Sequence, residues 1–268
     1  MQEALGDWIN LQSHQKAAYS ILTSLYDANT LTQNDTGNRL LEWFIRFDLI
    51  TSFIAGSPAA LSRDWHEATH RYFLNQIKES PHDLAHKYDE RGAAQRLLAQ
   101  DVAALFRKAG KVPPEEFQHD ASLISQSISA WYRDLSPSLL DPSKILHDYP
   151  HNFSPVLRTE NDADSAIVYG DDLWPTNHMM VHFWSLELMF NHHLSMIQGE
   201  STSSPAEHVT NIALKICQIF EAVQQRDPMP GALLGVQAAS GMAVPFLRRE
   251  PAMIMWGRQK QALIERSG

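Results

Sequence analysis

Residues 40–54 read LLEWFIRFDLITSFI, and this stretch decides the fold class. At the helical spacing of about 100° per residue, Glu42 and Arg46 form the one clear polar stripe, one turn apart as an ion-pairing couple. Apolar side chains cover both flanks of the stripe, with Leu40, Trp43, Phe44, Phe47, Ile50 and Ile54 on one flank and Leu41, Ile45, Leu49 and Phe53 on the other. Such a pattern predicts a central helix that neighbouring helices wrap on both sides.

Cap and breaker residues outline further helices on both sides of this stretch. Asn34 and Asp35 are favourable caps before it, and Ser62 with Asp64 predicts a second helix after Ser57-Pro58. Similar start and stop signals stand at Pro81-His82-Asp83, Gly110, Pro113-Pro114, Asn177, Ser204-Pro205-Ala206-Glu207, Asp227-Pro228 and Pro251. We find no strand pattern and no internal repeat.

The helical periodicity fails between residues 135 and 170. Four prolines fall there, at positions 137, 142, 150 and 155, and an acidic segment follows at 160–164. We expect a long irregular connection that crosses the surface. The sequence therefore predicts an all-α chain, one compact multi-helix domain over residues 1–268 with one long irregular loop at about 135–170.

Composition argues against several functional classes. The chain has 31 acidic and 22 basic residues, a net charge of −9, which is the opposite of a surface that holds a phosphate backbone. The single cysteine, Cys217, excludes an internal disulfide or a cysteine-built zinc finger within these residues, and its apolar neighbours predict a buried thiol. No apolar stretch is long enough to span a bilayer, and we expect no secretory signal and no membrane partner.

Residues 66–70 read HEATH and match the H-E-x-x-H motif of zinc hydrolases. On a helix, His66 and His70 lie one turn apart and could share a zinc ion, with Glu67 as the general base. The third ligand of the extended motif is missing, and the surroundings are polar because of Arg63, Asp64 and Arg71. We therefore interpret the segment as a solvated helix face and keep a zinc-dependent hydrolase as the alternative.

Four histidines fall within an arc of about 100° on the helix that begins near Asn177, namely His178, His182, His192 and His193. His178 and His182 are spaced to bind a metal, but no carboxylate shares their face. We interpret the four as lining an interhelical contact or a polar cavity. If the chain binds a small effector between helices, this face is the candidate pocket.

Asp48 lies among apolar residues of the central helix, so its carboxylate needs a partner. We expect an ion pair with an arginine from another helix, because no neighbour in sequence supports a catalytic role. The chain has no glycine-rich phosphate loop, dinucleotide fingerprint, nucleophile elbow or calcium loop. The sequence therefore indicates no enzyme, no catalytic residue, no metal site and no cofactor.

Three blocks of sequence resemble the fungal-specific transcription factor domain, the regulatory domain of proteins with a six-cysteine zinc binuclear cluster. The first block comprises 41–48 (LEWFIRFD), Ala55-Gly56 and 61–65 (LSRDW), similar to the family's aromatic–acidic helix and the serine-capped helix after it. The second comprises 97–98, 101–105 (DVAAL), Glu115-Glu116-Phe117 and Trp131, and the third comprises 255–260 (MWGRQK) and 262–265 (ALIE). The blocks follow the family's order over nearly the whole chain.

This resemblance implies a regulatory module of transcription in the nucleus, without catalytic residues. The implied partners are proteins, including a second copy of the chain, and a small-molecule effector. No six-cysteine cluster or basic linker stands within the sequence. Zinc and DNA contacts are therefore expected only through such a cluster preceding residue 1. A helical scaffold without DNA binding is the remaining alternative.

Overall fold

The computed structural model describes residues 2–55, 59–159, 164–199, 207–226, 234–247 and 250–267. Within these ranges the regular elements are helices and no strand occurs, which confirms the all-α prediction. An isolated antiparallel bridge joins Ile145 to Tyr169. None of the helices described has the length and apolar character needed to cross a membrane. The chain divides into two compact units, residues 1–135 and 136–268, at the point where the helical periodicity fails.

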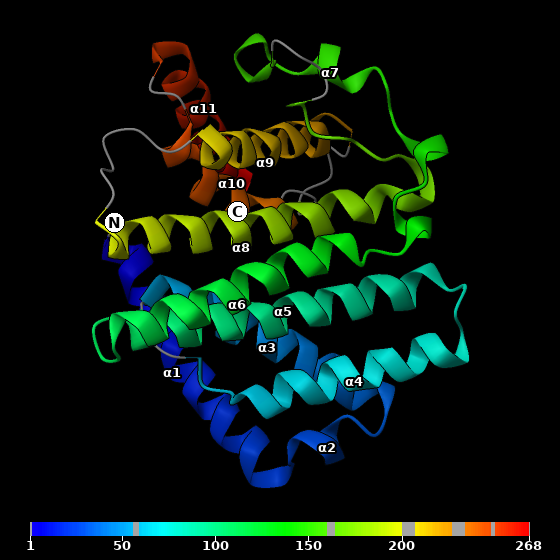
Figure 1. Cartoon of the computed structure of the whole chain (residues 1–268), viewed down its shortest axis with the longest axis vertical. Helices are drawn as coiled ribbons and strands as arrows, with labels where there is room; N and C mark the ends of the chain where they lie inside the picture. Colours follow the sequence, from blue (N-terminus) through cyan, green and yellow to red (C-terminus); the bar gives the residue numbers. More distant parts are fainter. Residues whose placement is uncertain are drawn as a thin grey trace. The chain divides into compact units, whose positions relative to one another are not determined.

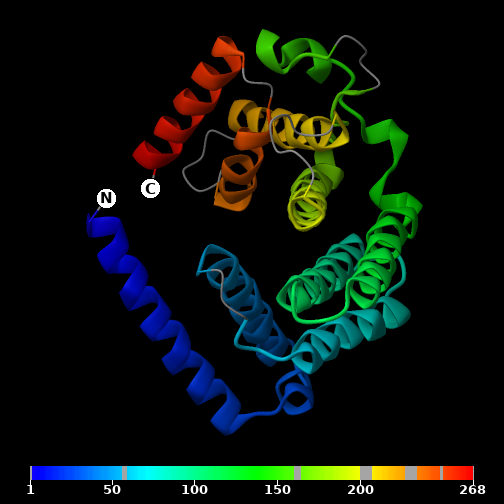
Figure 2. The same ribbon diagram turned by 60° about the vertical axis from the view of Figure 1, so that its left-hand side comes forward.

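Unit 1 is built from helices that follow one another closely along the chain (Figure 1). In order these are α1 (Gln2–Leu25), α2 (Ala28–Leu31), α3 (Asp35–Ala55), α4 (Arg63–Glu79), α5 (Leu84–Lys108) and α6 (Pro114–Arg133). Helices α4 and α5 form an antiparallel pair, and α6 packs on α5. The short α2 turns the chain between α1 and α3 (Figure 2). The predicted breaks near Pro81, Gly110 and Pro113 are confirmed, whereas α1 and α2 were not among the predicted elements.

Helix α3 contains the stretch at 40–54 and begins one turn before it. The side-chain oxygen of Asn34 accepts a hydrogen bond from the amide of Gly37 at 2.8 Å, which caps the helix as predicted. Leu41, Ile45 and Leu49 are buried on its inner side. The prediction that neighbours wrap both sides is wrong, because Leu40 and Trp43 are 51% and 63% exposed. The physical reason is that Glu42 turns inward to a buried arginine together with Leu41 and Ile45, so that the opposite arc of the helix, which carries Leu40 and Trp43, faces outward.

Gly37 allows α2 and α3 to approach closely. A methyl group at this position would overlap the carbonyl oxygen of Leu31, a backbone atom that cannot move without displacing α2. We therefore expect Gly37→Ala to lower the free energy of unfolding by about 2 kcal/mol, measured by urea denaturation. The matched control is Gly241→Ala on a helix of unit 2, where no atom lies within 4 Å of the added methyl. That change is expected to stabilise by up to about 1 kcal/mol, and the same loss in both variants would contradict the explanation.

The regular core of unit 2 consists of α8 (Trp174–Ile197), α9 (Glu207–Arg226) and α10 (Leu234–Ala243), which pack on one another (Figure 1). The turn η6 (Val244–Phe246) and α11 (Pro251–Ser267) follow. Cys217 on α9 is fully buried, as predicted, and burial together with Glu221 raises the pKa of its thiol. The predicted capping box begins at residues 204–206, outside the described residues, but α9 does begin at Glu207.

The first part of unit 2, residues 136–173, is irregular, as predicted, but it does not merely cross the surface. Short turns interrupt it, namely η1 (Pro137–Leu139), η2 (Pro142–Lys144), α7 (Tyr149–Asn152), η3 (Pro155–Leu157) and η5 (Asp171–Leu173). Leu139, Phe153 and Leu157 are fully buried. The side chain of Gln218 on α9 binds the backbone of this irregular stretch at two places. It donates a hydrogen bond to Leu157 O and accepts one from Ala166 N, each at 2.7 Å. Such side-chain partners allow an irregular backbone to enter a core.

Candidate functional site

A buried polar seam runs through unit 1 between α3, α4 and α5. We give this name to five side chains, namely Asn38 and Glu42 of α3, His66 of α4, and Arg96 and Gln100 of α5. All but Arg96 are buried residues, and the Arg96 side chain is only 12% exposed. Asn38 and Glu42, like Arg96 and Gln100, are one helical turn apart and so share a face of their helix. Burying such polar and charged groups costs free energy unless each of them is hydrogen-bonded or paired.

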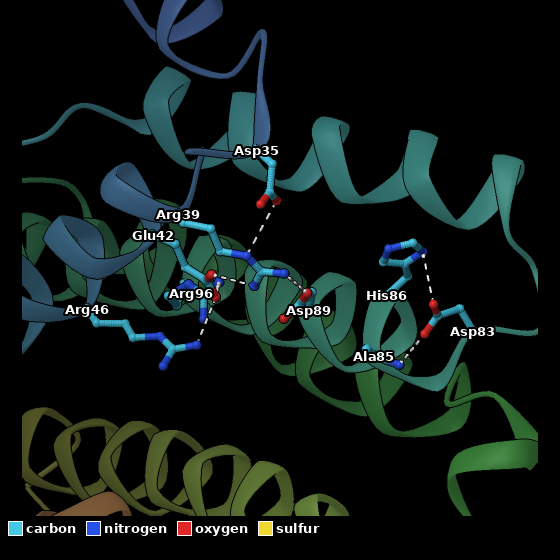
Figure 3. A network of polar contacts seen from close by, with 9 residues as sticks. All are labelled: Asp35, Arg39, Glu42, Arg46, Asp83, Ala85, His86, Asp89 and Arg96. Carbon is cyan, nitrogen blue, oxygen red and sulfur yellow. Dashed lines mark hydrogen bonds and ion pairs between the residues drawn. The ribbon is translucent and has the colours of Figure 1, made fainter. Parts of the chain in front are cut away.

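Glu42 is the centre of the seam (Figure 3). Its Oε1 accepts hydrogen bonds from Arg96 Nη2 at 2.7 Å and from Arg46 Nη2 at 2.8 Å. Arg39 Nη1 reaches Oε2 at 3.4 Å and binds Asp89 through Nη2 at 2.8 Å. Burial acts to raise the pKa of the Glu42 carboxyl, but the guanidinium groups of Arg96 and Arg46 outweigh it and lower the pKa. Glu42 is therefore ionised at neutral pH.

Arg96 is the partner that sequence reasoning missed. Burial lowers the pKa of its guanidinium to about 10, against the opposing effect of Glu42, so the group is still charged at neutral pH. Gly92 lies one turn earlier, and a methyl group there would come within 3.1 Å of Arg96 Nη1. The sequence signal for Arg96 was Gly92, a glycine in the middle of a helix, one turn before it. Glycine destabilises a helix, so its presence there indicates that a neighbouring side chain needs the space.

The HEATH segment is not the solvated face that we predicted, because His66 is only 1% exposed. The helix turns His66 toward α5, where burial and the nearby guanidinium of Arg96 lower its pKa to about 4. His70 Nε2 lies 2.8 Å from Glu90 Oε1 on α5. Glu67 pairs with Arg63 on the same helix. In the part of the chain that the structure describes, no group of three or more metal-ligating side chains could hold an ion.

The four histidines of α8 lie in different environments. His192 packs edge-to-face on Phe246 of η6, with ring centroids 4.8 Å apart, which fits the predicted interhelical contact. His193 Nδ1 lies 2.8 Å from the carbonyl oxygen of Met189 on its own helix. His178 lies against Trp174, and His182 is exposed. An effector pocket on this face stays a prediction.

Asp48 is buried, as expected, and two backbone amides and the side chain of Gln15 bind its carboxylate, while its pairing with an arginine stays a prediction. Its two carboxylate oxygens accept hydrogen bonds from the backbone amides of Ala60 and Leu61, each at 2.9 Å, and Gln15 of α1 also donates to it. These amides belong to the segment just before α4. Sequence spacing cannot reveal such backbone donors, because they are present at every position of the chain except proline.

The outer face of α3 is the second feature of unit 1. We use this name for Arg39, Leu40, Trp43, Arg46 and Phe47, which fall within an arc of about 120° opposite the buried side. Trp43 and Phe47 are stacked, with their rings parallel within 1° and their centroids 5.8 Å apart. Arg46 and Arg39 line one edge and carry the charges that bind Glu42. The face thus carries an aromatic stack bordered by cations.

No family model, curated protein or solved structure gives a significant match to this chain. The function has to be inferred from the features described above.

Proposed function

We propose that the chain is a non-enzymatic regulatory domain that acts on transcription in the nucleus by binding another protein through the outer face of α3. The link to transcription rests on the three sequence blocks that resemble the fungal-specific transcription factor domain. The acidic balance of the chain fits a module that leaves DNA contact to other sequences. The observation that carries the proposal is the exposed Trp43 stacked on the half-buried Phe47.

An exposed tryptophan is a typical anchor of a protein interface. Tryptophan and arginine are enriched among the residues that dominate binding energy, and the outer face of α3 supplies both side by side. The stack with Phe47 holds the indole in place, so little side-chain freedom remains to be lost on binding. Exposed apolar groups gathered on one helix face also mark interaction sites in soluble proteins.

The charges of this face define the partner. Arg46 and Arg96 share the single carboxylate of Glu42, which leaves one net positive charge in this group of three. Arg96 is buried, whereas the Arg46 side chain is 59% exposed beside Trp43. We therefore expect the partner to be an amphipathic helix that places apolar side chains on Trp43 and a carboxylate on Arg46. In the zinc-hydrolase alternative, His70 could offer zinc its Nε2 only by leaving Glu90 Oε1, and would otherwise have to bind through Nδ1.

The experiment is a tethered reporter assay. The chain is fused to the DNA-binding domain of an unrelated regulator, and transcription from a reporter gene with the matching sites is measured. The expected result is a reproducible rise or fall relative to the DNA-binding domain alone. A folded, nuclear and promoter-bound fusion that leaves transcription unchanged would reject the regulatory function and favour a scaffold. Metal analysis of untagged protein tests the hydrolase alternative separately, which requires one zinc ion per chain.

A further inference from the structure

Helix α1 buries little of its apolar surface. Among its side chains at residues 13–25, which the structure describes, only Leu22 is buried, whereas Ile21 and Leu25 are 60% and 67% exposed. Ile21 and Leu25 are one helical turn apart, so they share one side of the helix. Helices in proteins are stabilised mainly by packing an amphipathic face, and this part of α1 fully packs a single apolar side chain. Exposed apolar groups gathered in this way mark an interaction site.

Helix α1 runs antiparallel to α3 (Figure 2). The side chain of Gln15 on α1 donates a hydrogen bond to the buried carboxylate of Asp48 on α3, which fixes the register of the pair. Because α2 reverses the chain between the two helices, Leu25 lies toward the start of α3 and Gln15 toward its end. The pairing therefore extends over the part of α3 that carries its outer face.

The exposed side of α1 and the outer face of α3 lie on the same side of this pair. At about 100° per residue, Leu25 and Ile21 are turned by about 80° and about 120° from Gln15. Trp43 is turned by about 140° from Asp48, in the same sense of rotation about its own helix. In an antiparallel pair, equal senses of rotation away from the line of contact lead to the same side. We call the combined surface, Ile21 and Leu25 of α1 together with the outer face of α3, the α1–α3 face.

The charges of the α1–α3 face lie along one edge. Arg39 and Arg46 are on the side of Trp43 that points away from α1. Arg46 shares the carboxylate of Glu42 with a buried arginine, so its exposed charge is only partly met. The opposite edge is formed by residues 17–25 of α1, which include no charged side chain. The surface is therefore apolar in the middle, cationic at one edge and uncharged at the other.

We infer that the α1–α3 face is the full extent of the proposed interface and binds a single amphipathic helix whose acidic residues lie on one flank. This inference rests on the proposed function and adds α1 to it. The ten residues between Gln15 and Leu25 correspond to about 15 Å, so about three turns of the partner helix are in contact. A second copy of the chain would place another Arg39 and Arg46 on the same face, and this like charge disfavours self-association.

The test measures binding of two synthetic helical peptides to the full chain by fluorescence anisotropy. Both peptides carry the same stripe of leucines at helical spacing, and along one flank the first carries glutamates and the second carries lysines. We expect the glutamate peptide to bind at least about tenfold more tightly than the lysine peptide. Equal binding of the two peptides, or binding of neither, would overturn the inference.

Variants of the chain locate the bound peptide. The double variant Ile21→Gln with Leu25→Gln keeps good helix formers at two exposed positions, so its circular dichroism and unfolding curve are expected to match the wild type. We expect this double variant and Trp43→Ser each to weaken binding of the glutamate peptide at least about tenfold. Leu123→Ser, at an exposed position on α6, is the matched control and is expected to bind like the wild type.

These outcomes separate the inference from the proposed function. If Trp43→Ser weakens binding and the α1 double variant does not, α1 is no part of the interface, and the inference fails while the proposed function stands. A dimer in sedimentation equilibrium that the α1 double variant dissociates would show that a second copy occupies the face, which also overturns the inference. The expected peptide binding together with a silent fusion in the reporter assay would support the inferred helix site and reject the role in transcription.

Discussion

Replacing Glu42 with glutamine is expected to lower the free energy of unfolding by about 3–5 kcal/mol, because the change leaves the charge of Arg96 buried without a counter-ion. The Arg96 side chain is 12% exposed and cannot reach water as Arg46 can. Urea denaturation at neutral pH, followed by circular dichroism, measures the loss. Arg46→Gln is the matched control on the exposed side of the same carboxylate, with an expected cost of at most about 1 kcal/mol.

The double variant Glu42→Leu with Arg96→Met separates charge from packing. Apolar residues of similar size remove both buried charges together, so we expect the double variant to recover most of the stability lost in Glu42→Gln. If the double variant is as unstable as Glu42→Gln, the contribution of Glu42 and Arg96 to the free energy of unfolding comes from how their side chains pack and not from their charges. A cost below about 1 kcal/mol for Glu42→Gln would mean that the seam is hydrated well enough to tolerate a free guanidinium.

Acidification is expected to destabilise unit 1 through His66. Burial and the charge of Arg96 lower the pKa of this imidazole to about 4, below the value of about 6.5 that it has in an unfolded chain. Between these two values the unfolded state binds a proton that the folded state does not. Stability attributable to His66 is therefore fully present above pH 6.5 and is lost as the pH falls toward 4. A difference of about 2.5 pKa units corresponds to about 3 kcal/mol.

The measurement compares the wild-type chain with His66→Leu, because carboxylates titrate in part of the same range. We expect the stability of the wild type, relative to that of the variant, to fall by about 3 kcal/mol between pH 7 and pH 4. His119→Leu on α6 is the control, since His119 is exposed. Parallel pH profiles for the wild type and His66→Leu would show that His66 is protonated in the folded state well above pH 4.

The sequence was sufficient to predict most of the helices, though not α1 and α2, because their signals are local. Capping residues, prolines and the apolar run at 40–54 depend on neighbours within one or two turns, and α3, α4 and α6 begin within a few residues of the predicted positions. The irregular stretch after residue 135 was also recognisable from its prolines. Its burial was not, because it depends on Gln218, more than 50 residues away from the backbone groups that it satisfies.

The candidate sites were harder to predict because burial is a property of the packed unit. His66 stands among charged neighbours in sequence and was interpreted as solvated, whereas Glu42 was expected to pair with Arg46 on its own helix. Whether such a residue turns inward depends on what the facing helix offers, which here is Arg96, 54 residues after Glu42. The exposure of Trp43 could not be predicted either, because a helix with two apolar sides does not show from its sequence which side is buried.

The most direct measurement of the central claim compares Trp43→Ser with Leu123→Ser in the tethered reporter assay. Both residues are exposed and apolar, but Leu123 lies on α6, away from the outer face of α3. Removing an anchoring tryptophan costs about 2 kcal/mol or more in binding, which is about thirtyfold in affinity. We expect Trp43→Ser to abolish the effect on transcription while its unfolding curve matches the wild type, and Leu123→Ser to retain the effect. A Trp43→Ser chain that regulates as well as the wild type would contradict the outer face of α3 as the working surface of this protein.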